Sequence, residues 1–140
     1  MSGASVAEPS QQEPARAAGP KRVLACDDEP DVTRLVARFL GFSGFEVETL
    51  SDPREVIPRL EAEPVDLLVL DLLMPELNGE DVLEQLRARE DALAETKVLV
   101  LTAKLLTPAQ RAHLRELRAT VMQKPFLLHE LLQRVHQVVS

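Results

Sequence analysis

The feature that most constrains the fold is a repeated alternation of short apolar runs with segments of helical periodicity. Each run is too short for a helix, and apolar residues recur every three or four positions in the segment that follows it. The apolar runs lie at 23–26, 45–50, 65–70, 98–101 and 120–123. This alternation predicts an α/β fold in which right-handed crossovers place helices on both faces of a parallel sheet.

The apolar runs differ in how completely they are buried. Residues 65–70 and 98–101 are almost entirely apolar, which is typical of strands covered on both faces. Residues 45–50 alternate apolar and polar side chains, as a half-buried strand does. Five β-α units fit a doubly wound, flavodoxin-like three-layer sandwich with strand order 2-1-3-4-5. In that order the first, third and fourth strands are central, and the fifth lies at an edge.

Prolines and glycines predict where the helices begin and end. Pro30 is placed to begin the first helix, and Gly41 can end it. Pro53 and Pro64 bound the second helix, and Pro58 inside it predicts a kink or an early break. The remaining helices are expected after Asn78-Gly79, from about Thr107 with Pro108 in the first turn, and over residues 128–138.

Residues 1–20 have a different character from the rest of the chain. They are rich in Ala, Pro, Gln, Ser and Glu and show no periodicity. Such a segment buries too little apolar surface to offset the entropy of ordering, so we expect a disordered tail, with a partner-binding segment as the alternative. Residues 21–140 are long enough for one domain with a sizeable core.

Composition excludes several classes of function. The net charge of −7 argues against a nucleic-acid-binding surface, which needs clustered Lys and Arg. Without Trp or Tyr, the core must be built from Leu, Val and Ala. The single cysteine, Cys26, cannot form an internal disulfide, which indicates a reducing compartment. No apolar stretch has the length of a membrane span or a secretion signal, so we expect a cytoplasmic protein.

Polar side chains stand where the predicted strands end. Asp27 and Asp28 follow the first strand, Asp71 follows the third, and Thr102 and Lys124 follow the fourth and fifth. Because parallel strands end side by side, these groups are expected to ring one crevice. Carboxylates brought together there repel one another unless a cation joins them, which predicts a divalent-metal site. Taken alone, Asp71 would be read as a strand-end residue capping the next loop.

These motifs resemble the receiver domains of two-component response regulators, the CheY-like superfamily. The resemblance covers Lys21 to about Val139. The matching segments are Asp27-Asp28-Glu29, Asp71-Leu72-Leu73-Met74-Pro75, Asn78-Gly79, Thr102-Ala103 and Lys124-Pro125-Phe126. Each motif is weak alone, but five motifs in the right order on the right strand ends are a specific signal.

The resemblance implies a bacterial signalling role for Asp71. Asp71 is expected to accept a phosphoryl group from a sensor histidine kinase or a histidine phosphotransfer protein. A carboxylate can attack phosphorus and form an acyl phosphate. Lys124 would then pair with the phosphoryl oxygens, and the Thr102 hydroxyl would hydrogen-bond one of them. The resemblance also implies a cis bond between Lys124 and Pro125.

The expected cofactor is Mg²⁺, which prefers oxygen ligands and keeps several waters. Asp28 and Asp71 are expected as direct carboxylate ligands and the backbone carbonyl of Leu73 as a third. Asp27 is expected to act through water. Glu29 is expected to stabilise the start of the helix rather than bind the metal.

Phosphorylation is expected to control protein–protein contact rather than catalysis of a metabolic reaction. The resemblance implies a contact face formed by the fourth helix, fifth strand and fifth helix, and a homodimer is possible. Only self-phosphorylation from small donors and self-dephosphorylation are expected as reactions. Since the chain ends just after the last helix, we expect a stand-alone receiver or a receiver excised from a longer protein.

Several residues depart from the family pattern. Val121 stands where the family has an aromatic residue that follows the strand-4 hydroxyl inward on phosphorylation. Leu73 cannot hydrogen-bond an attacking water, which predicts slow-to-moderate hydrolysis of the acyl phosphate, and Lys104 occupies the other position that tunes this rate. The turn at 117–120 lacks the usual Gly-Ala, so we expect a tighter turn or a longer fourth helix. Leu105 and Leu106 are expected to pack against that helix or to form a docking patch.

The other candidate groups have simpler interpretations. Cys26 is expected to pack in the core, with a redox role as the alternative. His113, His129 and His136 lie on predicted helices without metal-ligand spacing.

Two competing functions stay open. A phosphatase of the haloacid dehalogenase type also places an aspartate after an apolar strand and uses Mg²⁺. That chemistry needs a second aspartate two positions later, where this chain has Leu73. The other alternative is a pseudo-receiver that docks partners without phosphorylation, which Val121 leaves possible.

Overall fold

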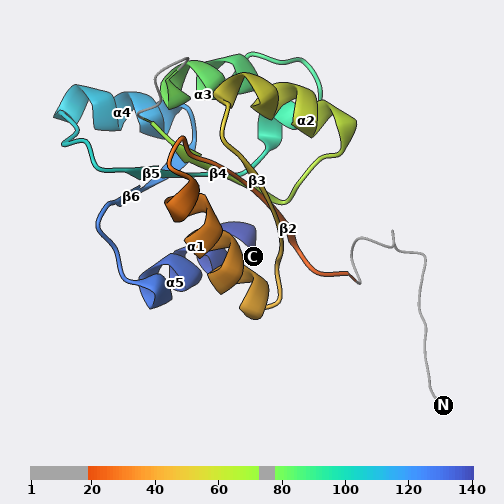
Figure 1. The fold of residues 1–140 in the computed structure, drawn as a ribbon. Coiled ribbons are helices and arrows are strands. Elements are labelled where there is room, and N and C mark those ends of the chain that lie inside the picture. The colour runs from red at the N-terminus through yellow and green to blue at the C-terminus, as the bar shows by residue number, and fades with distance from the viewer. Residues whose placement is uncertain (1–18, 73–77) are drawn as a thin grey trace.

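The computed structural model describes residues 19–72 and 78–140 (Figure 1). They contain a five-stranded parallel sheet in the order β3-β2-β4-β5-β6. The strands are β2 (Arg22–Cys26), β3 (Glu46–Leu50), β4 (Leu67–Asp71), β5 (Val98–Thr102) and β6 (Ala119–Gln123). In order along the chain this is 2-1-3-4-5, so the predicted α/β topology is confirmed.

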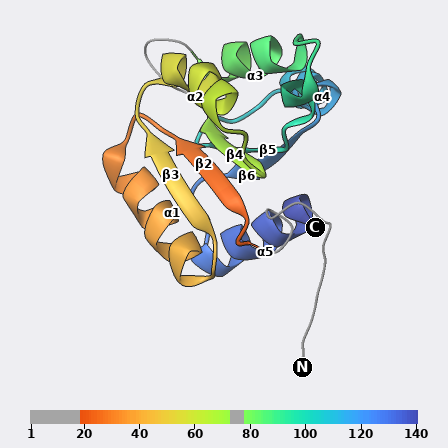
Figure 2. The ribbon, with the colours of Figure 1, turned by 90° about the vertical axis from the view of Figure 1, so that its right-hand side faces the viewer.

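In the described ranges, four α-helices and two short 3₁₀ turns connect the strands, and a fifth α-helix follows β6. The helices are α1 (Pro30–Phe42), α2 (Val56–Ala62), α3 (Gly79–Arg87), α4 (Pro108–Glu116) and α5 (Leu128–Val139), and the 3₁₀ turns are η2 (Pro53–Glu55) and η3 (Ala92–Glu95). Helices α1 and α5 cover one face of the sheet, and α2, α3 and α4 cover the other (Figures 1 and 2). No helix in the described ranges is long and apolar enough to cross a bilayer.

The sheet separates the core into two apolar clusters. Alternate residues of β4 point to opposite faces, so Leu68 and Leu70 join the cluster under α2, α3 and α4. Leu67 and Val69 join the cluster under α1 and α5. This two-sided burial explains why the strand needs an unbroken apolar run. The polar chain therefore resumes only where the strand leaves the core.

Two helices begin at the capping residues that the sequence indicates. The Asn78 side chain accepts a hydrogen bond of 3.0 Å from the Asp81 amide at the start of α3. At α4, Thr107 accepts from the Gln110 amide, and the Gln110 side chain accepts from the Thr107 amide. This reciprocal capping box satisfies amides that have no partner inside the helix.

The second helix differs from its prediction. The break falls between η2 and α2, upstream of Pro58. Pro58 is the third residue of α2, where a backbone amide has no partner within the helix, so proline fits there. Neither 3₁₀ turn was predicted.

The ends of α1 and α4 also depend on local backbone geometry. Helix α1 runs through Gly41 to Phe42, and Gly44 with φ +99° makes the turn into β3. Helix α4 ends at Glu116 and is not extended. Arg118 takes the left-handed conformation, with φ +59°, in the turn that lacks the family's usual Gly-Ala. A side chain other than glycine therefore occupies a strained turn position.

Candidate metal centre

Three carboxylates meet at the carboxyl end of the two central strands. Cys26 and Leu70 are register partners on β2 and β4, so Asp27 and Asp71 follow at neighbouring positions. Oxygens of Asp27, Asp28 and Asp71 all lie within 4.8 Å of one another. Asp27 and Asp71 are buried, whereas Asp28 is exposed. The sequence therefore predicted the convergence of these groups correctly.

The chemistry of this cluster fits a small, hard divalent cation. Among the described residues, the cluster offers carboxylate oxygens from three side chains, two of which are buried, and a cation would offset the repulsion between them. Mg²⁺ would fit such oxygen ligands, and the exposed Asp28 leaves the cluster accessible to the waters that this ion keeps. Leu73, whose carbonyl was the predicted third ligand, lies outside the described residues.

Lys124 places a cation directly on the acid cluster. Its Nζ lies 2.9 Å from Asp27 Oδ2, 3.6 Å from Glu29 Oε1 and 3.8 Å from Asp71 Oδ2. Burial works against the ammonium charge, but the hydrogen bond to Asp27 and the neighbouring carboxylates outweigh it and raise the pKa of Lys124. The hydrogen bond to Asp27 was not foreseen, since Lys124 was assigned only to phosphoryl oxygens.

Backbone contacts hold Lys124 beside the end of β5. The Lys124 amide donates to the Thr102 carbonyl at 2.8 Å, and the Lys124–Pro125 bond is cis, as predicted. The Thr102 side chain is fully buried, and its Oγ1 accepts a 3.0 Å hydrogen bond from the Lys104 amide. The ends of β5 and β6 thus supply one hydroxyl and one ammonium to the same region.

The turn after β2 orients the first acid. Asp27 Oδ1 accepts a 2.9 Å hydrogen bond from the Glu29 amide, and Oδ2 accepts from Lys124. Both oxygens of Asp27 are therefore engaged, which is consistent with an indirect role beside a metal. Glu29 precedes α1, and its side chain is largely exposed.

Gly79 is a positioning residue whose role the sequence motif did not explain. Its amide donates to the Leu72 carbonyl at 3.0 Å. A Cβ at this position would collide with the backbone carbonyl of Asp71 and crowd the Leu72 Cα. Helix α3 can therefore begin against the end of β4 only because residue 79 has no side chain.

Cys26 packs in the core, as predicted. It is buried directly before the acids, and burial together with the charges of Asp27, Asp52 and Asp71 raises its thiol pKa to about 12. The thiol is therefore protonated at neutral pH, which disfavours the redox alternative.

The family-divergent positions differ in how far they are buried. Val121 is half-buried on β6 and packs against the cluster under α2, α3 and α4, as does Leu106. Leu105 is 85% exposed, so the two leucines behave differently. The packing expectation holds for Leu106 and is wrong for Leu105.

Comparisons with known proteins agree with this geometry. Residues 23–136 match the family profile described as "Response regulator receiver domain". "Response regulator MprA" of Mycolicibacterium vanbaalenii is 37% identical over 120 residues, covering 86% of this chain and 51% of the relative. MprA of Mycobacterium leprae is 37% identical over 118 residues, covering 84% and 50%. The chain spans about half the length of these curated relatives.

Solved structures show the same fold. Chemotaxis protein CheY4 of Vibrio cholerae has a TM-score of 0.78 and 28% identity, covering 86% of this chain and 99% of that one. A putative response regulator of Chloroflexus aurantiacus has a TM-score of 0.77 and 26% identity, covering 86% and 98%.

Proposed function

This chain belongs to the receiver domain family of response regulators, and from that premise we propose that Asp71 is its phosphoacceptor. The observation that carries the proposal is the convergence of Asp27, Asp28, Asp71 and Lys124 at the carboxyl ends of three strands. The family match supports a role in two-component signalling. The individual residue roles are inferred from the geometry.

Asp71 is the nucleophile in this proposal. A carboxylate oxygen of Asp71 attacks the phosphorus of a phosphohistidine, the P–N bond breaks, and the histidine leaves with the electron pair and takes up a proton. Asp28 and Asp71 would hold Mg²⁺ directly, and Asp27 would hold it through water. Bound Mg²⁺ offsets the negative charge that the carboxylates and the phosphoryl group bring together.

Lys124 and Thr102 would stabilise the product. Lys124 Nζ is already 3.8 Å from Asp71 Oδ2 and can exchange its hydrogen bond with Asp27 for one with a phosphoryl oxygen. The Thr102 oxygen accepts from the Lys104 amide, and its hydroxyl hydrogen would be donated to a phosphoryl oxygen. These hydrogen bonds would connect the chemistry to the loop between β5 and α4.

The partners follow from the same proposal. The donor is a sensor histidine kinase or a histidine phosphotransfer protein, and the output is protein–protein contact through the face formed by α4, β6 and α5. Since the chain spans about half of its relatives, the partners of the whole protein are part of this proposal. That this domain does not bind nucleic acid stays a prediction.

Acetyl phosphate with Mg²⁺ tests the phosphoacceptor. Intact mass spectrometry should show one added phosphoryl group on wild type and on Asp31→Asn, an exposed acid on α1 that serves as the matched control. Asp71→Asn should gain none. Chelation of Mg²⁺, or Asp28→Asn, should reduce the rate of phosphorylation by roughly tenfold or more, as expected when charge neutralisation is removed. A phosphoryl group on Asp71→Asn, or none on wild type, would contradict the proposal.

A further inference from the structure

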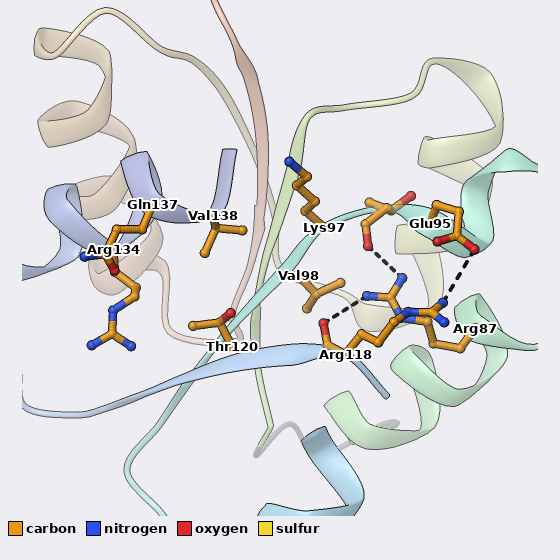
Figure 3. Close-up of a pocket in the computed structure, with 10 residues that line it drawn as sticks. Arg87, Glu95, Lys97, Val98, Arg118, Thr120, Arg134, Gln137 and Val138 are labelled. Carbon is orange, nitrogen blue, oxygen red and sulfur yellow. Dashed lines mark hydrogen bonds and ion pairs between the residues drawn. The ribbon is translucent and has the colours of Figure 1, made fainter. Parts of the chain in front are cut away.

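A second concave site lies at the opposite end of the sheet from the acid cluster. It is a cavity of about 460 Å³, where β5 and β6 begin (Figure 3). Arg87 at the end of α3, Lys97 before β5, Arg118 before β6 and Arg134 on α5 all line it. Val98 at the start of β5 is about 13 Å from Thr102 at its end, given the rise of a strand.

The lining is strongly cationic in an acidic protein. Four lining residues are cations, and Glu95 is the one acid among them, although the whole chain carries a net charge of −7. Figure 3 shows Arg134 on the α5 side of the cavity and Arg87, Arg118 and Glu95 on the other, with Val98 and Thr120 between them. The charges therefore surround a space rather than follow a solvated helix face.

Arg87 is fixed in place without being neutralised. Its Nε donates to the Leu117 carbonyl at 2.7 Å, and its Nη1 donates to the carbonyls of Ala94 and Thr96 at 2.8 and 2.6 Å. Within the described residues, no carboxylate lies within ion-pair distance of this guanidinium. Burial and the nearby Arg118 lower its pKa, yet arginine remains charged at neutral pH.

The other cations are only weakly compensated. Arg118 Nη2 is 3.7 Å from Glu95 Oε2, and both side chains are more than half exposed, so their attraction is screened by solvent. Arg134 Nη1 donates to the Val121 carbonyl at 3.5 Å, a long hydrogen bond to an uncharged group. Neither Arg134 nor the exposed Lys97 has a carboxylate within 4.0 Å in the part of the chain that the structure describes.

We propose that this cavity binds a small phosphate-bearing molecule with several negative charges, such as a diphosphate. The guanidinium groups of Arg118 and Arg134 can bind phosphate oxygens through charge-assisted hydrogen bonds. Arg87 donates its Nε and Nη1 hydrogens to carbonyls, so it contributes a fixed positive charge rather than a pair of parallel hydrogen bonds. The cavity has the volume of a small-molecule site. The site is independent of Asp71, so either proposal can fail alone.

Pyrophosphate is the probe for this site. The full chain is titrated at constant ionic strength without Mg²⁺, and amide chemical shifts are followed by NMR. We expect saturable shifts at Lys97, Val98 and Thr120, with Asp27 and Asp71 unchanged because their carboxylates repel anions. Shifts that do not saturate, or that scatter over exposed arginines such as Arg34, would overturn the proposal.

Two exposed residues, Lys97 and Glu95, allow one positive and one negative charge to be removed from the cavity in separate variants. Lys97→Gln should weaken pyrophosphate binding roughly threefold to tenfold, and Glu95→Gln should strengthen it by a similar factor, as single charges near a phosphate do. Arg34→Gln on α1 is the control and should leave the affinity unchanged. Equal affinities for wild type, Lys97→Gln and Glu95→Gln would contradict the site.

Citrate separates phosphate recognition from charge alone. It carries comparable negative charge on carboxylates instead of phosphate groups. Pyrophosphate should bind at least roughly threefold more tightly than citrate, because phosphate oxygens are better hydrogen-bond partners for guanidinium groups. Equal binding of the two anions would overturn the assignment to phosphate-bearing ligands.

Discussion

Two single residues, Lys124 and Gly79, shape the surroundings of the acid cluster at the end of β4. The Lys124 ammonium lies within 4.0 Å of oxygens from Asp27, Glu29 and Asp71, which offsets the cost of burying two of these acids. Gly79 allows α3 to begin against the Asp71 carbonyl. One residue supplies charge and the other supplies space, and the acid cluster needs both.

Substitution of Gly79 tests this need for space. Gly79→Ala should lower the free energy of unfolding by about 1–3 kcal/mol, because the new methyl group collides with backbone that cannot move freely. It should also slow phosphorylation by acetyl phosphate. Gly41→Ala is the matched control: it lies inside α1 with open space around it and should stabilise the protein by about 0.5–1 kcal/mol. Urea unfolding measures both, and equal effects would rule out the steric explanation.

A titratable side-chain pair, His113 and Glu84, connects helices α3 and α4. His113 Nε2 on α4 lies 2.7 Å from Glu84 Oε2 on α3, and Glu116 Oε1 is 3.8 Å from His113 Nδ1. The hydrogen bond to Glu84, aided by the charges of Glu84, Glu80 and Glu116, raises the pKa of His113 above its ordinary value of 6.5. This pair connects α4, which belongs to the proposed output face, to the helix that follows Asp71.

The pair predicts a pH dependence of defined sign. Because the pKa of His113 is raised on folding, its contribution to stability is complete below pH 6.5 and is lost as the pH rises through the folded pKa. Glu84→Gln should therefore lower the pKa of His113 toward 6.5 and destabilise the protein at acidic pH more than at alkaline pH. An NMR titration of the three histidines checks this, with His129 as the internal control. An unchanged His113 titration would contradict the role of Glu84.

The elements differ in how far sequence could predict them. The central strands β2, β4 and β5 were predictable because two-sided burial demands apolar runs. Asp27, Asp71 and Thr102 mark where these apolar runs stop. The break before α2 and the left-handed conformation of Arg118 could not be predicted, because neither feature produces a recognisable pattern in the amino-acid sequence. The hydrogen bond from Lys124 to Asp27 joins residues 97 positions apart, so only the folded sheet reveals it.

In the described residues, two side-chain clusters of opposite charge lie at the two ends of the sheet. The acids gather where the strands end, and the cationic cavity lies where β5 and β6 begin. Arg87 holds the second end together, since its guanidinium contacts η3, the start of β5 and the turn before β6. Sequence reasoning missed this residue because its acceptors are backbone carbonyls up to 30 positions away, which leave no motif.

Arg87 should consequently be important for global stability. Arg87→Met keeps much of the apolar stem but removes the side-chain donor to the Leu117 and Thr96 carbonyls and one of the two donors to the Ala94 carbonyl, which should lower the free energy of unfolding by about 2–4 kcal/mol. Arg111→Met, on the exposed side of α4, should change it by no more than about 0.5 kcal/mol. Chemical denaturation followed by circular dichroism measures the free energy of unfolding of both variants. Similar losses of stability in the two variants would argue against a stabilising role for the Arg87 hydrogen bonds.

Because the sheet divides the interior into two apolar clusters, each cluster can be followed separately by NMR. Leu68 and Val69 are adjacent in sequence, yet their methyl groups enter separate halves of the interior. Isotope labels on these two neighbours would act as independent sensors, one for the layer that contains α2, α3 and α4 and one for the layer that contains α1 and α5. A rearrangement restricted to one layer would change one resonance and leave the other in place.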